Sequence, residues 1–359
     1  MNIHDSLKKM VDLDASDLFY HVGVSPRYKI DGKVLSLDNN ILNMQDLTQA
    51  VEDITPARHK DTLKNKYNVD FIVYSSEMDR RFRINMFIQR GTPSIVIRHV
   101  KTATQTFEEL NLPGEVLKKL SMEMRGLVIL TGTMGSGKST TIASMIEHIN
   151  NNTKKHILTV EDPIEYAFKD KECLINQREI GTDVPSYSEA LRSFTLQSPD
   201  VLFISNIRDY ETMRAAMTAA ETGVLVLSTL HTVNAAQSVE RIINFFPPHQ
   251  HQEIRNELSS LLKGVIALRL VPLKGGKGRI PAYEVMLLTS TIGRLIREGK
   301  VREIPQFIEE GGVFGMQSFM QTLVKLVREE KVSQEDAEKF ADNKEEFVLT
   351  LKGIRKDKL

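Results

Sequence analysis

The sequence predicts an α/β protein made of a small α+β domain followed by a larger α/β domain. With 359 residues, the chain is longer than one ordinary domain and long enough for two well-buried cores. From Arg125 onward, apolar segments of strand length alternate with loops and amphipathic helical segments. This alternation is typical of a mainly parallel sheet covered by helices, and the first hundred residues lack it.

The small domain is expected over residues 1–100. Apolar residues recur at helical spacing through residues 3–13, and the segment YKIDGKVLSL predicts a hairpin that turns at Asp31-Gly32. A helix is expected near residues 44–66. Residues 69–100 then contain three strand-like runs separated by polar residues or by glycine and proline.

Residues 101–120 are expected to form a linker to the larger domain, which covers residues 121–359. Its first half alternates strand and helix from GLVILTG to VLVLSTLH. Beyond about residue 250 the pattern becomes mostly helical, and RLVPLKGGKGRIPAYEVM predicts one strand pair around a glycine-rich turn. The basic end LKGIRKDKL is expected to fray.

Composition disfavours several classes of protein. Lys plus Arg and Asp plus Glu both number 47, so no global basic field favours nucleic acid or an anionic membrane. The single cysteine, Cys173, excludes a disulfide framework and a multi-cysteine zinc site, and it is expected to be a small buried residue. No apolar stretch approaches the ~20 residues of a membrane helix, and the N-terminus lacks an uninterrupted apolar region. We therefore expect a cytoplasmic protein without direct membrane insertion.

The most specific motif is a phosphate-binding loop. GTMGSGKS matches G-x-x-x-x-G-K-[ST] and lies between an apolar strand and a helical pattern, the context that this motif requires. Backbone N–H groups of such a loop turn towards phosphates, and the following helix directs its positive end at the same charge. Lys138 is expected to reach the β and γ phosphates, Ser139 to place its hydroxyl on Mg²⁺, and Thr140 to lie near the α phosphate. The expected nucleotide contacts are Gly132, Thr133, Met134, Gly135, Ser136, Gly137, Lys138, Ser139 and Thr140.

Acidic residues gather after the next predicted strand. Glu161, Asp162 and Glu165 surround a proline in TVEDPIEY. Such a strand end can supply the acid that orients or deprotonates water in a triphosphate site. The same cluster is also compatible with a solvated turn, and the residues alone leave both interpretations open. His231 follows another apolar strand, where a packed or capping role is the commoner one.

The order of these motifs resembles a known family. GTMGSGKSTT, TVEDPIEY, LINQREIGTD, SEALRS, SPDVLFISNIRD, AAETGVLVLSTLHT and RIINFFPP follow one another as in the bacterial type IV pilus retraction ATPases of the PilT and PilU kind, within the secretion ATPase superfamily. The resemblance extends over residues 15–327, and RIINFFPP, GKGR and the tail after EEKVSQEDAEKFADN look closer to the PilU type. It implies a RecA-like P-loop core with a helical C-terminal part, preceded by a PAS-like domain.

The resemblance implies that ATP is hydrolysed with Mg²⁺. It assigns Glu165 as the residue that activates water and places Glu161 and Asp162 beside the Mg²⁺. It also gives His231 a contact with the γ phosphate.

Two arginines and several partners are also implied. Arg83 and Arg98, on neighbouring strands of the small domain, fall on family positions that face the nucleotide, where a guanidinium can grip phosphate oxygens in pairs. The resemblance further implies a homo-hexamer in the cytoplasm at the inner membrane, in which the angle between domains follows the nucleotide state. Its implied partners are the inner-membrane platform protein of the pilus base and a fully active PilT-like retraction ATPase.

One departure from the family stands at Asn206. The family ends this strand in Gly-Glu, and this chain has Ser205-Asn206. An amide keeps one acceptor oxygen but carries no charge and takes no proton, so we expect ATP binding with hydrolysis slowed by ~10²-fold or more. Leu196 likewise stands where the family commonly has arginine. Thr291 and Arg294 replace Ala and Asn in an element that these motors need for retraction.

Three interpretations of Asn206 stay open. The chain is a weak ATPase in which Glu165 supplies the base, an ATP-binding regulatory subunit without useful turnover, or a form with a substitution introduced to trap ATP. Two other functions are less favoured. A pilus assembly or secretion ATPase of the same superfamily usually carries a four-cysteine zinc element, and a nucleic-acid translocase usually carries interleaved basic and aromatic residues.

Overall fold

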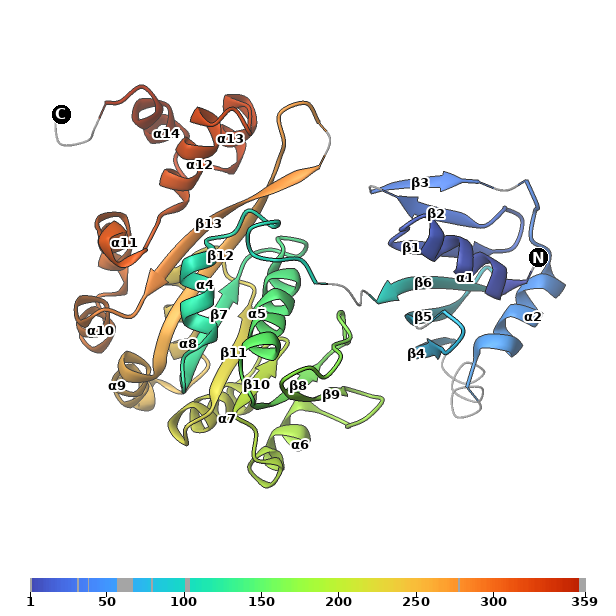
Figure 1. Ribbon diagram of the computed structural model, residues 1–359, viewed down its shortest axis with the longest axis horizontal. Helices are drawn as coiled ribbons and strands as arrows, with labels where there is room; N and C mark the ends of the chain where they lie inside the picture. Colours follow the sequence, from blue (N-terminus) through green and yellow to red (C-terminus); the bar gives the residue numbers. More distant parts are fainter. Residues whose placement is uncertain are drawn as a thin grey trace. The chain divides into compact units, whose positions relative to one another are not determined.

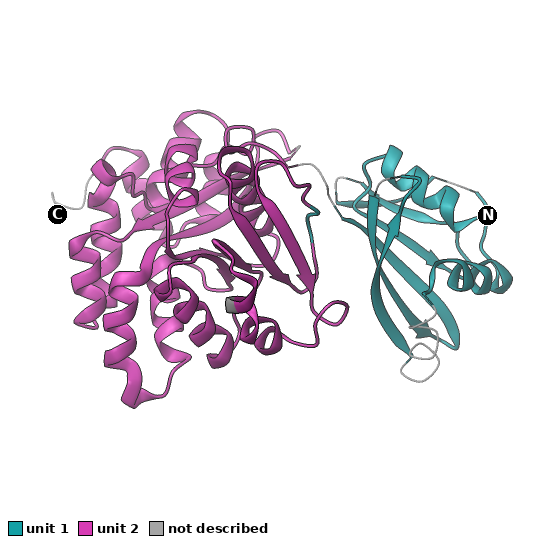
Figure 2. Ribbon diagram, turned by 60° about the horizontal axis from the view of Figure 1, so that its bottom comes forward, with its two compact units in different colours: residues 1–103, 165–167 teal, residues 104–164, 168–359 magenta. Residues whose placement is uncertain are grey.

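The computed structural model describes residues 2–30, 32–37, 39–56, 67–78, 80–100, 104–276 and 278–354. The chain divides into two compact units (Figure 2): unit 1 comprises residues 1–103 and 165–167, and unit 2 comprises residues 104–164 and 168–359. Each unit is built on its own sheet (Figure 1). Among the residues so described, no helix is long and apolar enough to cross a membrane.

Unit 1 contains an antiparallel six-stranded sheet in the order β3-β2-β1-β6-β5-β4, with helices α1 and α2 packed on it. Both helices begin at an asparagine whose side chain accepts from backbone N–H groups, Asn2 for α1 and Asn43 for α2. The apolar faces of the helices cover the sheet and form one core with it. The elements are α1 (Ile3–Asp12), β1 (Asp17–His21), β2 (Arg27–Ile30), β3 (Lys33–Ser36), α2 (Met44–Ile54), β4 (Asn68–Ser75), β5 (Arg80–Gln89) and β6 (Thr92–Val100).

The predicted strands of unit 1 are confirmed. β2 and β3 form the expected hairpin, with Ile30 opposite Lys33, although its turn residue Asp31 lies outside the described residues. The three strand-like runs are β4, β5 and β6. The helix expected near residues 44–66 begins as α2 and ends at Ile54, and residues 57–66 lie outside the described residues.

Unit 2 contains a seven-stranded sheet in the order β13-β12-β7-β11-β10-β8-β9, in which all neighbours pair in parallel except β12 and β13. This is the mainly parallel sheet that the alternating pattern predicts. Its strands are β7 (Gly126–Thr131), β8 (His156–Glu161), β9 (Leu174–Glu179), β10 (Val201–Ile204), β11 (Leu225–Leu230), β12 (Leu262–Pro272) and β13 (Arg279–Leu287). Its α-helices are α4 (Gly114–Ser121), α5 (Lys138–Asn152), α6 (Tyr187–Arg192), α7 (Tyr210–Glu221), α8 (Ala235–Asn244), α9 (His251–Leu261), α10 (Ser290–Arg297), α11 (Ile304–Glu310), α12 (Phe319–Arg328), α13 (Gln334–Phe340) and α14 (Lys344–Leu351).

Helices cover both faces of this sheet. Strands β7, β10 and β11 are buried at every position, as expected for parallel strands that have no solvent face. Successive residues of β7 point to opposite faces: Leu127 and Ile129 share a core with α7, α8 and α9, whereas Val128 and Leu130 share one with α4 and α5. Helices α12 to α14 pack on β12 and β13 (Figure 1).

Three details concern the sequence predictions. Residues 104–120, expected to be a linker, belong to unit 2 by their contacts, and Phe107, Leu117 and Leu120 lie in its core. Strand β9 was not predicted, because its residues alternate between exposed and covered positions and form no apolar run. Cys173 is buried and free, as expected, and its Sγ donates to Thr153 O.

Candidate functional site

Four parallel strands of unit 2 bring predicted site residues to one edge of the sheet. β7 pairs with β11, β11 with β10, and β10 with β8, all in parallel. These strands therefore end at the same edge, and the loops that follow them lie side by side. The residues at or after the four ends are Gly132 (β7), His231 (β11), Asn206 (β10) and Glu161 (β8).

The phosphate-binding loop between β7 and α5 depends on its glycines. Gly132, Gly135 and Gly137 have φ angles of 142°, 75° and 100°, which L side chains rarely adopt. A Cβ on Gly132 would lie 2.5 Å from Leu268 O and 2.5 Å from Ser136 Oγ. Position 132 therefore requires glycine both for its backbone conformation and for space.

Lys138 lies inside the loop that precedes it. Its side chain is buried, and Nζ donates hydrogen bonds to Gly132 O (2.8 Å) and Thr133 O (2.9 Å). Helix α5 begins at Lys138, and its N-cap residue, Gly137, supplies no side-chain cap for the first N–H groups. A positive charge beside such a helix start is an arrangement that binds phosphate. Of the other expected contacts, Thr133, Met134 and Gly135 are exposed, Ser136 is buried, and Ser139 and Thr140 are half-buried.

The acid loop, residues 162–173 between β8 and β9, follows Glu161 and carries the other two predicted acids. Glu161 is buried at the end of β8, and its Oε1 accepts from Thr159 Oγ1 (2.7 Å). Asp162 is exposed. Glu165 is also exposed and lies in the short segment that is grouped with unit 1. The structure thus places Glu161 and Asp162 at the sheet edge that carries the phosphate-binding loop.

Strand β9 holds the acid loop with two side chains that the sequence did not single out. Gln177 Nε2 donates to Glu161 Oε1 (3.0 Å), and Gln177 Oε1 accepts from Phe168 N (2.9 Å). Glu179 is buried, and its Oε2 accepts from Ile164 N (3.0 Å). Both residues lie in the motif LINQREIGTD, to which no role was assigned.

Asn206 follows β10 and contacts His231. Its Nδ2 is 3.2 Å from His231 Nε2, and because an amide nitrogen only donates, Nε2 of the ring is the acceptor and carries no proton. Asn206 is 8% exposed, and its Oδ1 has no hydrogen-bond partner within the part of the chain that the structure describes. A buried polar atom of this kind is costly unless a ligand or water fills the site. The site therefore offers an acceptor oxygen next to a neutral histidine.

The surroundings of His231 favour the neutral ring. Partial burial is the largest factor that lowers the pKa of His231 below its ordinary value, followed by the positive charges of Lys138 and Arg208. A hydrogen bond to the Gly132 backbone acts in the opposite direction and is weaker. The lowered pKa agrees with the acceptor role of Nε2, because a protonated ring could not accept the bond from Asn206.

The two predicted arginines lie directly opposite each other on β5 and β6 of unit 1. Arg83 Nε donates to Asp70 Oδ1 (3.0 Å), and Arg98 Nε donates to Asp17 Oδ1 (2.9 Å). Residues opposed in this way share one face of a sheet. The Arg98 side chain is 61% exposed in spite of its ion pair.

A hydroxyl bridge links the acid loop to β10 and α6. Ser205 Oγ accepts from Asp162 N (3.1 Å) and shares a hydrogen bond with Tyr187 OH (2.7 Å). Burial raises the pKa of Tyr187 to about 12, so the phenol keeps its proton. The sequence showed serine at this family glycine position but gave no sign of this bridge, because Tyr187 is far from Ser205 along the chain.

The remaining departures lie away from the four strand ends. Leu196 is 87% exposed in the 3-10 turn η1 (Phe194–Gln197). Thr291 and Arg294 lie in α10, where Arg294 pairs with Glu298 across one helical turn (3.6 Å). This pair is exposed on both sides, so it contributes little to stability.

Comparison with known proteins decides the family. The family described as "Type II/IV secretion system protein" matches residues 2–338, which is most of the chain. The chain belongs to this family. The type IV pilus ATPase PilU of Pseudomonas aeruginosa is 39% identical to it over 352 residues, covering 98% of this chain and 92% of PilU. The type IV pilus retraction ATPase PilT of the same organism is 40% identical over 349 residues, covering 97% of this chain and 100% of PilT.

A solved structure gives the same result for the fold of this secretion-family chain. The pilus retraction motor PilT with bound ADP aligns with a TM-score of 0.89 at 39% identity, over 96% of this chain and 98% of the PilT chain. The resemblance that the motifs indicate and the α/β fold with a RecA-like ATPase core are therefore confirmed.

Proposed function

We propose that this protein is a motor ATPase of the type IV pilus system that drives or assists pilus retraction, as in twitching motility. The observation that carries the proposal is the identity of 39% to PilU and 40% to PilT over nearly the whole chain. It is supported by a phosphate-binding loop whose glycines and lysine are in place. The solved structure of PilT contains ADP, which supports nucleotide binding by this chain.

We assign ATP, with Mg²⁺, to the loop between β7 and α5. Two features suit a phosphate-bearing ligand. The space beside Gly132 would be filled by a Cβ, and the Lys138 ammonium lies beside a helix start that has no side-chain cap. On binding, Lys138 would exchange its bonds to the loop oxygens for phosphate oxygens. Ser139 would add its hydroxyl to the Mg²⁺, which takes few protein ligands where phosphates supply the others.

Hydrolysis needs a group that takes a proton from water, and we assign this role to Glu165. A carboxylate can act as this base if it is held within reach of the attacking water. Its chain neighbour Ile164 is fixed by the buried Glu179, which steadies the loop beside it. Glu161 and Asp162, at the strand-end edge, would lie beside the Mg²⁺.

The remaining assignments concern charge on the phosphates. We assign His231 to the γ phosphate because it follows β11 at the sheet edge that also carries Lys138. The charge of Lys138 lowers the pKa of His231, which indicates that the two side chains are close. We assign Arg83 and Arg98 to the nucleotide as well. A guanidinium stays charged and can hold phosphate oxygens with paired N–H donors.

We further propose that Asn206 weakens hydrolysis. Its amide donates to His231 Nε2, so this ring nitrogen accepts a bond and offers no proton to a phosphate. A carboxylate at this position would instead favour the imidazolium, whose positive charge would stabilise phosphate oxygens. Loss of one such electrostatic or acid–base contribution commonly lowers a rate by ~10²-fold or more.

The contact between Asn206 and His231 also supports a second candidate function. A subunit that binds ATP but turns it over too slowly to be useful can serve as a regulatory partner of an active PilT-like ATPase. The two candidates differ in one property. The weak motor releases phosphate when no partner is present. The regulatory subunit releases no measurable phosphate by itself and changes the rate of its partner.

We propose a homo-hexamer at the cytoplasmic side of the inner membrane, acting on the platform protein of the pilus base. In this assembly unit 1 is the small domain and unit 2, which includes residues 104–120, is the ATPase domain. The names of the relatives as pilus ATPases support this arrangement. The balanced charge of 47 basic and 47 acidic residues gives no support to nucleic acid as a partner.

The proposal is tested by binding and turnover on the purified full-length chain. Titration with a fluorescent ADP analogue and Mg²⁺ is expected to show saturable binding. Phosphate release from ATP is then measured with the chain alone and with an active PilT-like ATPase. Absence of nucleotide binding would refute the motor proposal, and brisk release by the chain alone would refute the weakening by Asn206.

A further inference from the structure

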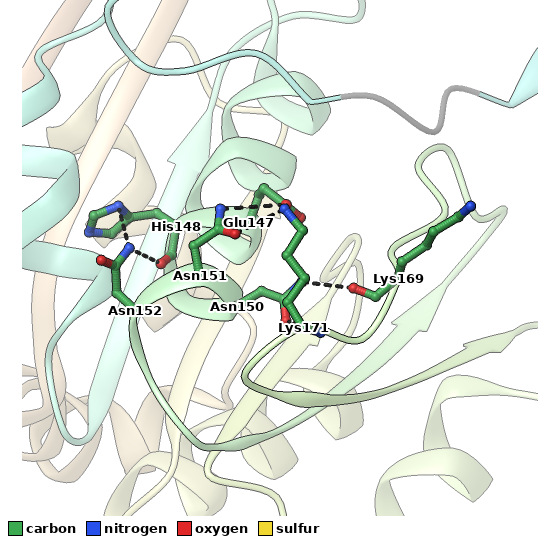
Figure 3. Close-up of polar contacts among 7 residues, drawn as sticks. All are labelled: Glu147, His148, Asn150, Asn151, Asn152, Lys169 and Lys171. Carbon is green, nitrogen blue, oxygen red and sulfur yellow. Dashed lines mark hydrogen bonds and ion pairs between the residues drawn. The ribbon is translucent and has the colours of Figure 1, made fainter.

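The C-terminal end of helix α5 carries a buried amide, Asn150, that binds the acid loop (Figure 3). Asn150 is 0% exposed. Its Nδ2 donates to Lys169 O (2.9 Å), and its Oδ1 accepts from Lys171 N (3.2 Å). The backbone oxygen of Asn150 also accepts from Glu172 N (3.1 Å). One residue of α5 thus binds three backbone groups of the acid loop.

The contact depends on the side-chain amide. An amide supplies a donor and an acceptor side by side, and an aliphatic side chain in its place would leave the Lys169 carbonyl and the Lys171 N–H without these partners. The exposed neighbour Asn151 makes a different contact, since its Oδ1 accepts from Lys171 Nζ (2.9 Å) (Figure 3). That bond holds the end of a long side chain and leaves the loop backbone untouched.

Helix α5 connects the acid loop to the phosphate-binding loop. It begins at Lys138, and Asn150 lies roughly 18 Å further along the helix axis at a rise of about 1.5 Å per residue. On the other side of the acid loop, β9 holds Ile164 through Glu179. Strand β9 also holds Phe168 through Gln177, so Glu165 lies between two anchors from β9, and the anchor that Asn150 provides follows directly at Lys169.

We propose that Asn150 is a positioning residue for Glu165, tying the acid loop to the helix that holds the phosphates so that Glu165 keeps the orientation that hydrolysis needs. This inference rests on the proposed function, which gives Glu165 its role. A displacement of about 1 Å in a reacting group can cost ~10²-fold in rate, so loosening the loop is expected to slow the chemical step. Asn150 lies at the opposite end of α5 from Lys138, so nucleotide affinity is expected to stay unchanged.

Asn150→Ala and its matched control Asn151→Ala separate the two contacts in the full-length chain. The rate is measured by single-turnover phosphate release, which resolves slow hydrolysis, and affinity by titration with fluorescent ADP. Asn150→Ala is expected to slow release by about tenfold or more and to change ADP affinity by less than about twofold, while Asn151→Ala behaves as wild type. Asn150→Asp fills the same volume but sets an acceptor against the Lys169 carbonyl, so it is expected to slow release without forming a cavity.

A double-variant comparison shows whether Asn150 acts through Glu165. Adding Asn150→Ala to Glu165→Gln is expected to lower the rate no further. The same fold loss in both backgrounds would show a general structural role and overturn the inference, as would a wild-type rate in Asn150→Ala. Failure of the proposed function looks different, because ADP then does not bind, or Glu165→Gln itself keeps the wild-type rate. Absent ADP binding or a wild-type rate in Glu165→Gln would show that Glu165 does not have its proposed role, and the inference about Asn150 would then be wrong as well.

Discussion

Replacement of Asn206 by glutamate is expected to speed hydrolysis by about 10²-fold, because it restores a charged acid beside His231. In the wild type, Asn206 Nδ2 donates to His231 Nε2 at 3.2 Å, and this bond requires the neutral ring. A glutamate carboxylate at position 206 removes this requirement for a neutral ring. It accepts a hydrogen bond and favours the ring that carries both protons.

The change in the pKa of His231, which is one part of this effect, follows from the distance and the exposure of the two groups. Opposite charges about 4 Å apart attract by ~4 kcal/mol at an effective dielectric constant of about 20. Because His231 is only partly buried, solvent screening reduces this figure to ~1 kcal/mol, or roughly fivefold in the protonation equilibrium of the ring. Asn206 is 8% exposed, so burial of the new carboxylate opposes part of the gain. The expected result is a higher pKa of His231 together with faster phosphate release.

Two assays and one matched variant test this reasoning. The His231 ring signals are followed by NMR as a function of pH and assigned by their loss in His231→Gln, and phosphate release is measured on the same samples. Asn206→Gln has the length of glutamate without its charge and is expected to match wild type in both assays. Equal rates in Asn206→Gln and Asn206→Glu, or an unchanged pKa of His231, would refute the electrostatic explanation.

Other substitutions test separate parts of the structure. Lys138→Ala is expected to weaken ADP binding by about tenfold or more in a fluorescence titration, and to raise the pKa of His231, since the Lys138 charge lowers it; unchanged affinity would contradict the phosphate role. Gly132→Ala is expected to lower the melting temperature and abolish ADP binding, because its Cβ would lie 2.5 Å from Leu268 O at a φ of 142°, and a wild-type melting curve would contradict this. Burial raises the pKa of Glu284 from 4.5 to about 7, and its Oε1 accepts from Ala235 N (2.7 Å). The folded state therefore holds this proton more tightly, and stability falls by about 3 kcal/mol as pH rises from about 4.5 to about 7. Glu284→Gln keeps an acceptor oxygen and is expected to flatten that slope in urea unfolding, whereas an unchanged slope would assign it to other groups.

The sequence by itself determined the parts of the protein that depend on local patterns. Glycines at residues 132, 135 and 137 are needed because the loop backbone adopts positive φ there, so the motif is visible without tertiary contacts. Buried parallel strands appear as continuous apolar runs, and this made the α/β core readable in β7, β10 and β11. The ordered motifs then gave the family, and comparison with PilU and PilT confirmed it.

Only the tertiary structure decided which side chains meet. Three hydrogen-bonded contacts join residues from different elements. They are Asn206 with His231, Asn150 with the acid loop, and Glu179 with Ile164 N. The edge strand β9 escaped prediction because a half-exposed strand leaves no apolar run. A hydrogen bond between distant residues leaves no periodic trace in a sequence, since it depends on how the elements pack and not on the pattern within any one of them.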